Sequence, residues 1–164
     1  MAQPTLRDRH LAAPPQPLRP VIGVIDDDPS VLKSLVRLLR AAGYFVVPFA
    51  STELFLETHQ AWTLHCLVLD VHFEGMSGFD LETYLTDSGL RFPIVFITAH
   101  DDAALRERVE ATGQAFLRKP FEETELLEAI NRMVAAHPSP SAPVPPPSAP
   151  SATPGSKKRP RGMH

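Results

Sequence analysis

Five short apolar runs recur along the middle of the chain, and a segment with helix-forming sequence follows each of them. The runs lie at 21–25, 44–49, 65–69, 94–97 and 115–118. Short apolar runs bounded by turn-forming residues are typical of buried strands. Pro48 has no backbone N–H to donate to a neighbouring strand. The second run is therefore an edge strand, or Pro48 lies at the end of its strand. Strands alternating with helices predict an α/β fold with a doubly wound, five-stranded parallel sheet.

Capping signals indicate where the helices begin. Asp28 followed by Pro29 is typical of an N-cap with proline in the first turn. Ser51 is a second candidate cap, and Ser77 with Asp80 has capping-box spacing. Together with the apolar periodicity, these signals predict helices at 30–42, 52–59, 78–88, 100–112 and 122–136.

Proline divides the chain into three parts. Of the 18 prolines, five lie in residues 1–20 and nine lie from Pro138 onward. The segment 138–156 has no charge and no apolar periodicity, so it buries too little surface to offset the entropy cost of ordering. We expect a disordered leader at 1–20, a folded domain at 21–137 and a disordered Pro/Ser/Ala-rich tail at 138–164 with a basic end.

The net charge of −3 conceals a division between the parts of the chain. Residues 21–137 carry 9 Lys+Arg against 18 Asp+Glu, whereas the segment KKRPR at 157–161 holds four cations. An acidic domain binds nucleic acid poorly over most of its surface. Nucleic-acid binding is therefore unlikely from the domain and would have to come from the tail, with modest affinity that falls as salt rises.

Cys66 is the only cysteine, which excludes an intrachain disulfide. It lies in an apolar run, where a free cysteine is typically a small core residue. The sequence shows no apolar stretch of membrane-spanning length and no signal-peptide core after Met1. We expect a cytoplasmic chain that has no membrane partner.

Polar side chains stand where the expected strands end. Asp26 and Asp27 follow the first strand, Asp70 the third, Thr98 the fourth and Lys119 the fifth. Each alone is readily explained as a cap or turn former. In an open parallel sheet, however, the carboxyl ends of the strands meet at one edge, and ligands bind there. We therefore expect these five side chains to converge.

The chemistry of such a set points to phosphoryl transfer. Three converging carboxylates repel one another and raise their pKa values, and a hard cation such as Mg²⁺ with its preference for oxygen ligands relieves the repulsion. An ammonium and a hydroxyl beside the metal suit the charge that develops on phosphoryl oxygens. A carboxylate can also act as the nucleophile and form an aspartyl phosphate.

Four motifs then stand in a recognisable order: VIDDDPSV, LVLDVHFEGMSG, VFITAH and FLRKPF. Residues 21–137 resemble the receiver domain of two-component response regulators, in particular the FixJ-like branch. The resemblance implies a flavodoxin-like (βα)5 fold. It also implies a signalling switch, not an enzyme, whose chemistry is limited to Mg²⁺-dependent autophosphorylation and autodephosphorylation.

The resemblance assigns the metal and phosphoryl ligands. Asp70 would be the phosphoacceptor. Asp26 and Asp27 would form the acidic pair around Mg²⁺, with Asp27 the more direct ligand. Asp70 and the backbone carbonyl of His72 would complete the protein ligands.

The resemblance also assigns the switch residues. Thr98 would be the switch hydroxyl, and Phe116 the aromatic side chain that turns inward when Thr98 moves. Lys119 would pair with the phosphoryl group, and its peptide bond to Pro120 is expected to be cis.

Some positions depart from the family pattern or modify it. Glu74 stands where the family usually has proline, and the stretch from Thr98 to Phe116 is one residue shorter than expected. His72 and His100 occupy positions that tune phosphoryl hydrolysis in the family, although both also fit exposed loop histidines. They lack the further ligands of a zinc site.

The leading hypothesis is a stand-alone receiver. A sensor histidine kinase or phosphotransfer protein would donate to Asp70, and a face made of the fourth helix, fifth strand and fifth helix would bind an effector or form a homodimer. Three alternatives remain: a nucleic-acid-binding regulator acting through the basic tail, a transcription regulator without its DNA-binding half, and a degenerate receiver that accepts no phosphoryl group.

Overall fold

The computed structural model describes residues 19–59, 63–100 and 103–138. The strands are β1 Val21–Ile25, β2 Phe45–Phe49, β3 Cys66–Asp70, β4 Ile94–Thr98 and β5 Ala115–Arg118. The helices are α1 Pro29–Ala41, α2 Thr52–Thr58, α3 Gly78–Asp87, α4 Ala103–Thr112 and α5 Glu123–Ala136. Residues 1–18 of the expected leader and 139–164 of the expected tail lie outside these residues, so the structure does not test them.

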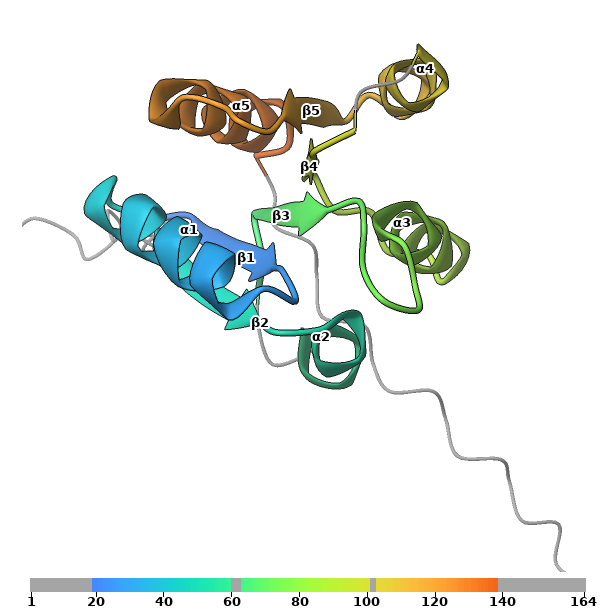
Figure 1. Cartoon of the computed structure of the whole chain (residues 1–164), viewed down its shortest axis with the longest axis horizontal. Coiled ribbons are helices and arrows are strands. Elements are labelled where there is room, and N and C mark those ends of the chain that lie inside the picture. The colour runs from blue at the N-terminus through green and yellow to red at the C-terminus, as the bar shows by residue number, and fades with distance from the viewer. Residues whose placement is uncertain (1–18, 60–62, 101–102, 139–164) are drawn as a thin grey trace, which may run out of the picture.

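The five strands form one parallel sheet in the order β2-β1-β3-β4-β5. Figure 1 shows the sheet edge-on, with α1 and α5 on one face and α2, α3 and α4 on the other. This is the predicted doubly wound α/β architecture. The chain reverses its direction of progress beside β1, so β1 and β3 form the topological switch point at which ligands bind in such sheets.

The two faces of the sheet bury separate cores. On the α1/α5 face, strand residues pack against helix side chains such as Leu39 and Ile130. On the other face, the buried aromatic side chains are those of Phe49, Phe55, Phe79, Phe92 and Phe96. Strands buried on both faces explain the continuous apolar runs. Cys66 is fully buried as expected, and burial raises the pKa of its thiol to about 12.

The predicted caps form. The Asp28 side chain accepts hydrogen bonds from the backbone N–H groups of Ser30 and Val31 at the start of α1. Ser77 and Asp80 form a reciprocal capping box on α3. Each cap satisfies backbone donors that a helix N-terminus leaves without partners. The starts of these two helices are thereby fixed directly after β1 and in the loop after β3.

Element boundaries differ slightly from the predictions. β2 begins at Phe45, because the N–H of Tyr44 instead donates to Leu39 O at the end of α1. β3 includes Asp70, whose Cα pairs with Ile97 of β4. β2 is an edge strand, which accommodates Pro48. Throughout the described ranges, no helix is long and apolar enough to cross a membrane.

Candidate functional site

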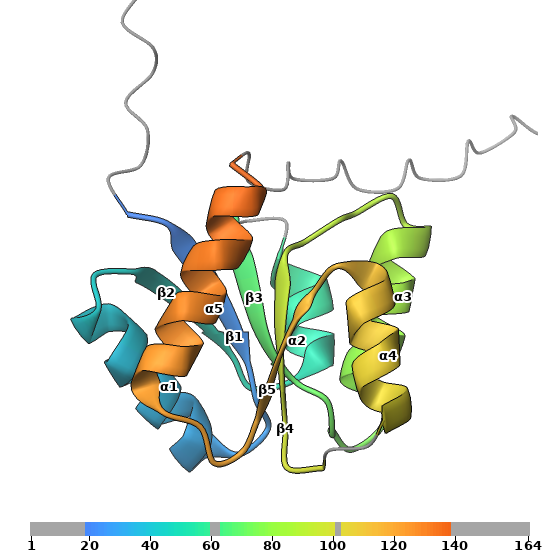
Figure 2. The same cartoon turned by 90° about the horizontal axis from the view of Figure 1, so that it is seen from above.

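The carboxyl ends of β1, β3, β4 and β5 meet at one edge of the sheet, at the bottom of Figure 2. The residues expected there occupy it: Asp26 directly follows β1, Asp70 and Thr98 end β3 and β4, and Lys119 directly follows β5. The parallel topology therefore brings together side chains that are as much as 93 residues apart in the sequence, from Asp26 to Lys119.

Lys119 joins the two acidic strand ends. Its Nζ lies 2.6 Å from Oδ2 of Asp70 and 3.9 Å from Oδ2 of Asp26. The side chain of Lys119 is 28% exposed, that of Asp70 13% and that of Asp26 4%. A charge-assisted hydrogen bond of this length in a partly dehydrated position is among the stronger polar contacts in proteins. It fixes the ammonium directly over the Asp70 carboxylate.

Asp26 is the most buried acid of the site. Burial raises the pKa of its carboxyl above the usual range, and the charges of Asp70 and Asp27 act in the same direction. The Asp28 N–H, which donates to Oδ1 of Asp26 at 2.9 Å, and the charge of Lys119 oppose that rise. A buried carboxylate whose charged form is disfavoured gains from a nearby cation.

The donor set fits a hard divalent cation. The Asp26 and Asp70 carboxylates face a common ammonium, and oxygen donors of this kind are the ligands that Mg²⁺ prefers. Asp27 and His72, the other expected ligands, are exposed at the same edge, which leaves room for water ligands. Among the residues that the structure describes, no group of three or more His, Cys, Asp or Glu side chains is already arranged to hold a metal. A Mg²⁺ site here would therefore depend on water and backbone oxygens as well.

The loop after β3 is bound to the Asp70 carboxylate. The backbone N–H of His72 donates to Oδ1 of Asp70 at 2.8 Å, so Oδ1 and Oδ2 have different partners. Gly78 then packs against the strand end, where an added Cβ would lie 2.5 Å from the Asp70 carbonyl oxygen. This close approach explains why glycine begins α3, and it holds the loop at a fixed distance from the carboxylate.

Thr98 ends β4 between Asp70 and Lys119 and is fully buried. Its Oγ1 accepts a hydrogen bond from the backbone N–H of His100 at 3.1 Å. Its carbonyl oxygen accepts from the N–H of Lys119 at 2.7 Å. The Lys119–Pro120 peptide bond is cis, as expected. The hydroxyl and the ammonium are thus positioned by directly connected backbone.

Phe116 lies on β5 opposite Phe96 of β4 and is half-buried against the core of the α2/α3/α4 face. That position is consistent with an aromatic side chain able to move between core and solvent. Glu74 and Ala99 are both exposed in the loops beside the site.

One contact was not predicted from the sequence. The rings of His72 and His100 lie 4.8 Å apart at 84°, edge to face, above the Asp70 and Thr98 strand ends. Each histidine follows its strand end by two residues, and β3 and β4 are neighbours. That equal offset is the signal from which the contact could have been found.

The family model of the response regulator receiver domain matches residues 22–131. Nodulation protein W of Bradyrhizobium diazoefficiens is 40% identical over 111 residues, which are 67% of this chain and 49% of that protein. Among solved structures, the response regulator StyR is 43% identical with a TM-score of 0.65, over 72% of this chain and 60% of that one. The structure titled FixJ-N is 32% identical with a TM-score of 0.65, over 71% and 94% of the two chains.

The chain spans about half the length of the curated relatives that it matches. The matched region runs from the second residue of β1 into α5, and it leaves out only Val21 and the last five residues of that helix. Receiver domains are signalling proteins that interact with histidine kinases and effectors, and phosphorylation and Mg²⁺ dependence are general features of the family. With a family model that matches residues 22–131 and relatives 40% identical over two thirds of its length, the chain belongs to the response regulator receiver domain family.

Proposed function

We propose that this chain is a phosphorylation-controlled switch in which Asp70 accepts a phosphoryl group from a sensor histidine kinase or a phosphotransfer protein. One observation carries the proposal: the Lys119 ammonium lies 2.6 Å from Asp70 Oδ2 and 3.9 Å from Oδ2 of the buried Asp26. A carboxylate beside a fixed cation and a second acid is a nucleophile supplied with the charges that phosphoryl transfer needs.

An Asp70 carboxylate oxygen attacks phosphorus and forms the acyl phosphate O–P bond, while the P–N bond of a donor phosphohistidine breaks and its imidazole retains the electron pair. Lys119 stabilises charge on the phosphoryl oxygens by donating to one of them. Mg²⁺ held by Asp26, Asp27, Asp70 and the carbonyl of His72 would neutralise further negative charge there.

The signal would pass through Thr98 and Phe116. In the structure, Thr98 Oγ1 accepts a hydrogen bond from the N–H of His100. A phosphoryl oxygen on Asp70 would offer the proton of the same hydroxyl a charged acceptor. Movement of Thr98 toward it would vacate space for Phe116 and change the face made of α4, β5 and α5. That face would bind an effector or a second copy of the chain.

Stand-alone action and a cytoplasmic location are part of this proposal. The relatives include transcriptional regulators about twice as long as the matched region, which makes a component of the transcription machinery one class of effector that fits the proposal. The alternative that the basic tail binds nucleic acid rests on the cations at 157–161 alone, which lie outside the described residues.

The test is intact mass spectrometry after incubation with acetyl phosphate and Mg²⁺. We expect a single phosphoryl adduct that disappears in the Asp70→Asn variant and when Mg²⁺ is chelated. Asp87→Asn is the matched control, because Asp87 is an exposed acid at the end of α3 and its loss should leave the adduct unchanged. An adduct of equal yield in Asp70→Asn would refute the proposal, as would no adduct with any donor.

A further inference from the structure

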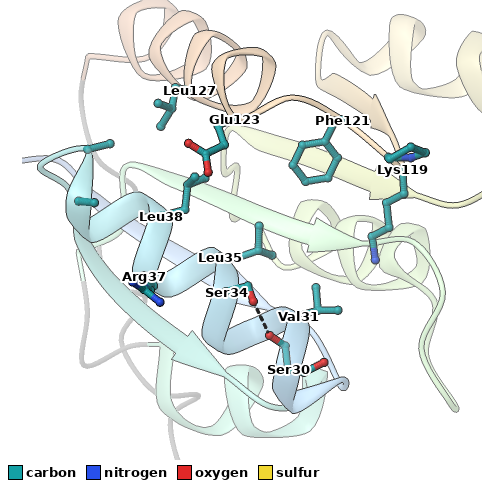
Figure 3. A pocket seen from close by; sticks show the side chains of 13 residues that line it. Ser30, Val31, Ser34, Leu35, Arg37, Leu38, Lys119, Phe121, Glu123 and Leu127 are labelled. Carbon is teal, nitrogen blue, oxygen red and sulfur yellow. Dashed lines mark hydrogen bonds between the residues drawn. The ribbon is translucent and has the colours of Figure 1, made fainter.

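The two faces of the sheet hold their outer helices differently. On one face, an open cavity of about 960 Å³, the α1/α5 groove, separates α1 from α5, and its lining includes Val31, Leu35 and Phe121 (Figure 3). Helix α5 nevertheless buries four side chains in the core of that face. On the other face, α4 buries Val109 alone among its ten residues, all of which the structure describes, and Leu105 is half-buried. Apolar burial therefore fixes the position of α4 much less than that of α5.

Arg108 of α4 makes a polar contact with the neighbouring helix α3, which lies beside α4 in Figure 2. Its guanidinium carbon lies 4.4 Å from the ring centroid of Phe79, and its Nη2 donates to Oγ1 of Thr83 at 3.4 Å. The Thr83 hydroxyl itself donates to the carbonyl oxygen of Phe79 at 2.9 Å, one helical turn back. A guanidinium that stacks on a ring and donates at its edge is fixed in orientation as well as in distance.

The charges of α3 around this contact favour a cation. Hydrogen bonds from Ser77 lower the pKa of Asp80, and the charge of Arg108 acts in the same direction. Burial raises the pKa of Glu82, and the charge of Arg108 opposes that rise. The guanidinium therefore interacts with two α3 carboxylates in addition to its ring and hydroxyl partners. This combination holds α4 against one particular turn of α3.

The ring that contacts Arg108 belongs to the core against which Phe116 is half-buried. Phe79 packs against Phe96 of β4, with ring centroids 4.8 Å apart at 34°. Phe96 is paired with Phe116 across β4 and β5, and Phe116 packs against the same core. A close-packed core admits a further ring only if neighbouring side chains move. An inward turn of Phe116 would therefore disturb the packing of Phe96 and Phe79, and with it the contact that holds α4 to α3.

We propose that Arg108 is a latch, which holds α4 against α3 in the arrangement that the structure shows and opposes the rearrangement of the face made of α4, β5 and α5. The contact with Phe79 and Thr83 is made only while α4 lies against that turn of α3, so it favours this arrangement over any in which α4 has moved. Because Arg108 is exposed, its loss should change the equilibrium about two- to fivefold. The inference rests on the proposed switch for the identity of the second arrangement, but the hold on α4 is measurable without phosphorylation.

Hydrogen exchange of the full, unphosphorylated chain tests the latch directly. Arg108→Met keeps an apolar stem and a comparable helix propensity but loses the guanidinium. We expect the α4 amides of Val109 and Ala111 to exchange about two- to fivefold faster than in the wild type, whereas the amide of Ile130 on α5 should keep its rate. Arg132→Met, which alters an exposed arginine on α5, is the matched control and should leave α4 unchanged. Wild-type exchange of α4 in Arg108→Met would overturn the proposal.

Amide NMR spectra separate a latch from a contact that only stabilises α4. In unphosphorylated Arg108→Met, the resonances of α4 and Phe116 should be displaced along the line that joins their wild-type positions without and with the Asp70 adduct. Arg108→Lys keeps a cation near the Phe79 ring, so its displacement should be smaller. Displacement in other directions, or an equal displacement in Arg108→Lys, would refute the latch. If the wild-type chain forms no adduct, the proposed function fails, and the exchange rates still decide whether Arg108 holds α4.

Discussion

The ammonium of Lys119 lies 2.6 Å from a carboxylate oxygen of Asp70, although 49 residues separate the two in the sequence. Asp70 ends β3 and Lys119 follows β5, so the lysine side chain extends past the end of β4 to reach its partner. The buried Thr98 at the end of β4 lies between them in the sheet. Nucleophile, cation and hydroxyl are thus set by the strand order rather than by any local motif.

Replacing Lys119 with methionine should slow phosphoryl transfer to Asp70. The variant keeps most of the apolar stem but loses the group that meets developing charge on the phosphoryl oxygens. We expect the initial rate of adduct formation to fall at least about tenfold, by analogy with the loss of one preorganised donor. Time-resolved intact mass with acetyl phosphate and Mg²⁺ measures this rate. Lys33→Met, on the exposed face of α1, is the control, and an equal effect there would argue against a specific role.

Changing Thr98 to alanine should separate modification from signalling. The chain should still form the adduct, but the amide resonances of Phe116 and α4 should no longer shift when it forms. Serine at the same position should restore the shift, because it restores the hydroxyl. The cost in stability should be about 1 kcal/mol, the net value of the hydrogen bond that the hydroxyl accepts from the N–H of His100. A full shift in Thr98→Ala would exclude the hydroxyl as the coupling group.

Gly78→Ala should disturb the site through the backbone of Asp70. A Cβ at this position would lie 2.5 Å from the carbonyl oxygen of Asp70 and 3.2 Å from Cα of Val71, and backbone atoms cannot move aside cheaply. We expect a loss of roughly 1–3 kcal/mol in unfolding free energy, typical of overpacking, and slower adduct formation. Urea titration and intact mass measure the two effects. Asp87→Ala in the same helix should show neither; a wild-type result for Gly78→Ala would mean that the strand end tolerates displacement.

Glu82 should make stability depend on pH. Burial raises the pKa of its carboxyl above the ordinary 4.5, and the charge of Arg108 opposes the rise. The native state then binds more protons than the unfolded chain between the two pKa values, so this group's contribution to unfolding free energy falls as pH rises through them. Relative to wild type, Glu82→Gln should gain stability from about pH 4 to pH 7, as measured by urea titration.

The matched control for this pH dependence is Glu110→Gln, which alters an exposed acid on α4. Its stability difference from wild type should stay nearly constant with pH. If Glu82→Gln gave the same flat difference, the native and unfolded pKa values of Glu82 would have to be equal.

The sequence was most informative where the cause of a structure is local. Asp28 and Ser77 cap helices in the structure as their side chains and spacing predict, because N-caps need only the following turn. The alternation of strands and helices also predicted a parallel sheet, and from it the convergence of Asp26, Asp70 and Lys119 at one edge.

Features that depend on tertiary packing could not be predicted from the sequence. Glu82 looks like an exposed helical acid, yet α3 turns it inward, and only the fold reveals its burial. The ring contact of His72 with His100 requires β3 and β4 to be neighbours, and the sheet order is not encoded by any single segment. The α1/α5 groove likewise arises from the spacing of two helices far apart in the chain.

The most direct test of the central claim is to locate the phosphoryl group. Borohydride reduces an aspartyl phosphate to the corresponding alcohol, which survives digestion and can be assigned by tandem mass spectrometry. After treatment with acetyl phosphate and Mg²⁺, the account predicts reduction at Asp70 and at no other acid, including the neighbouring Asp26 and Asp27. Reduction at either of those residues, or an unreduced Asp70 in a chain that carries the adduct, would contradict it.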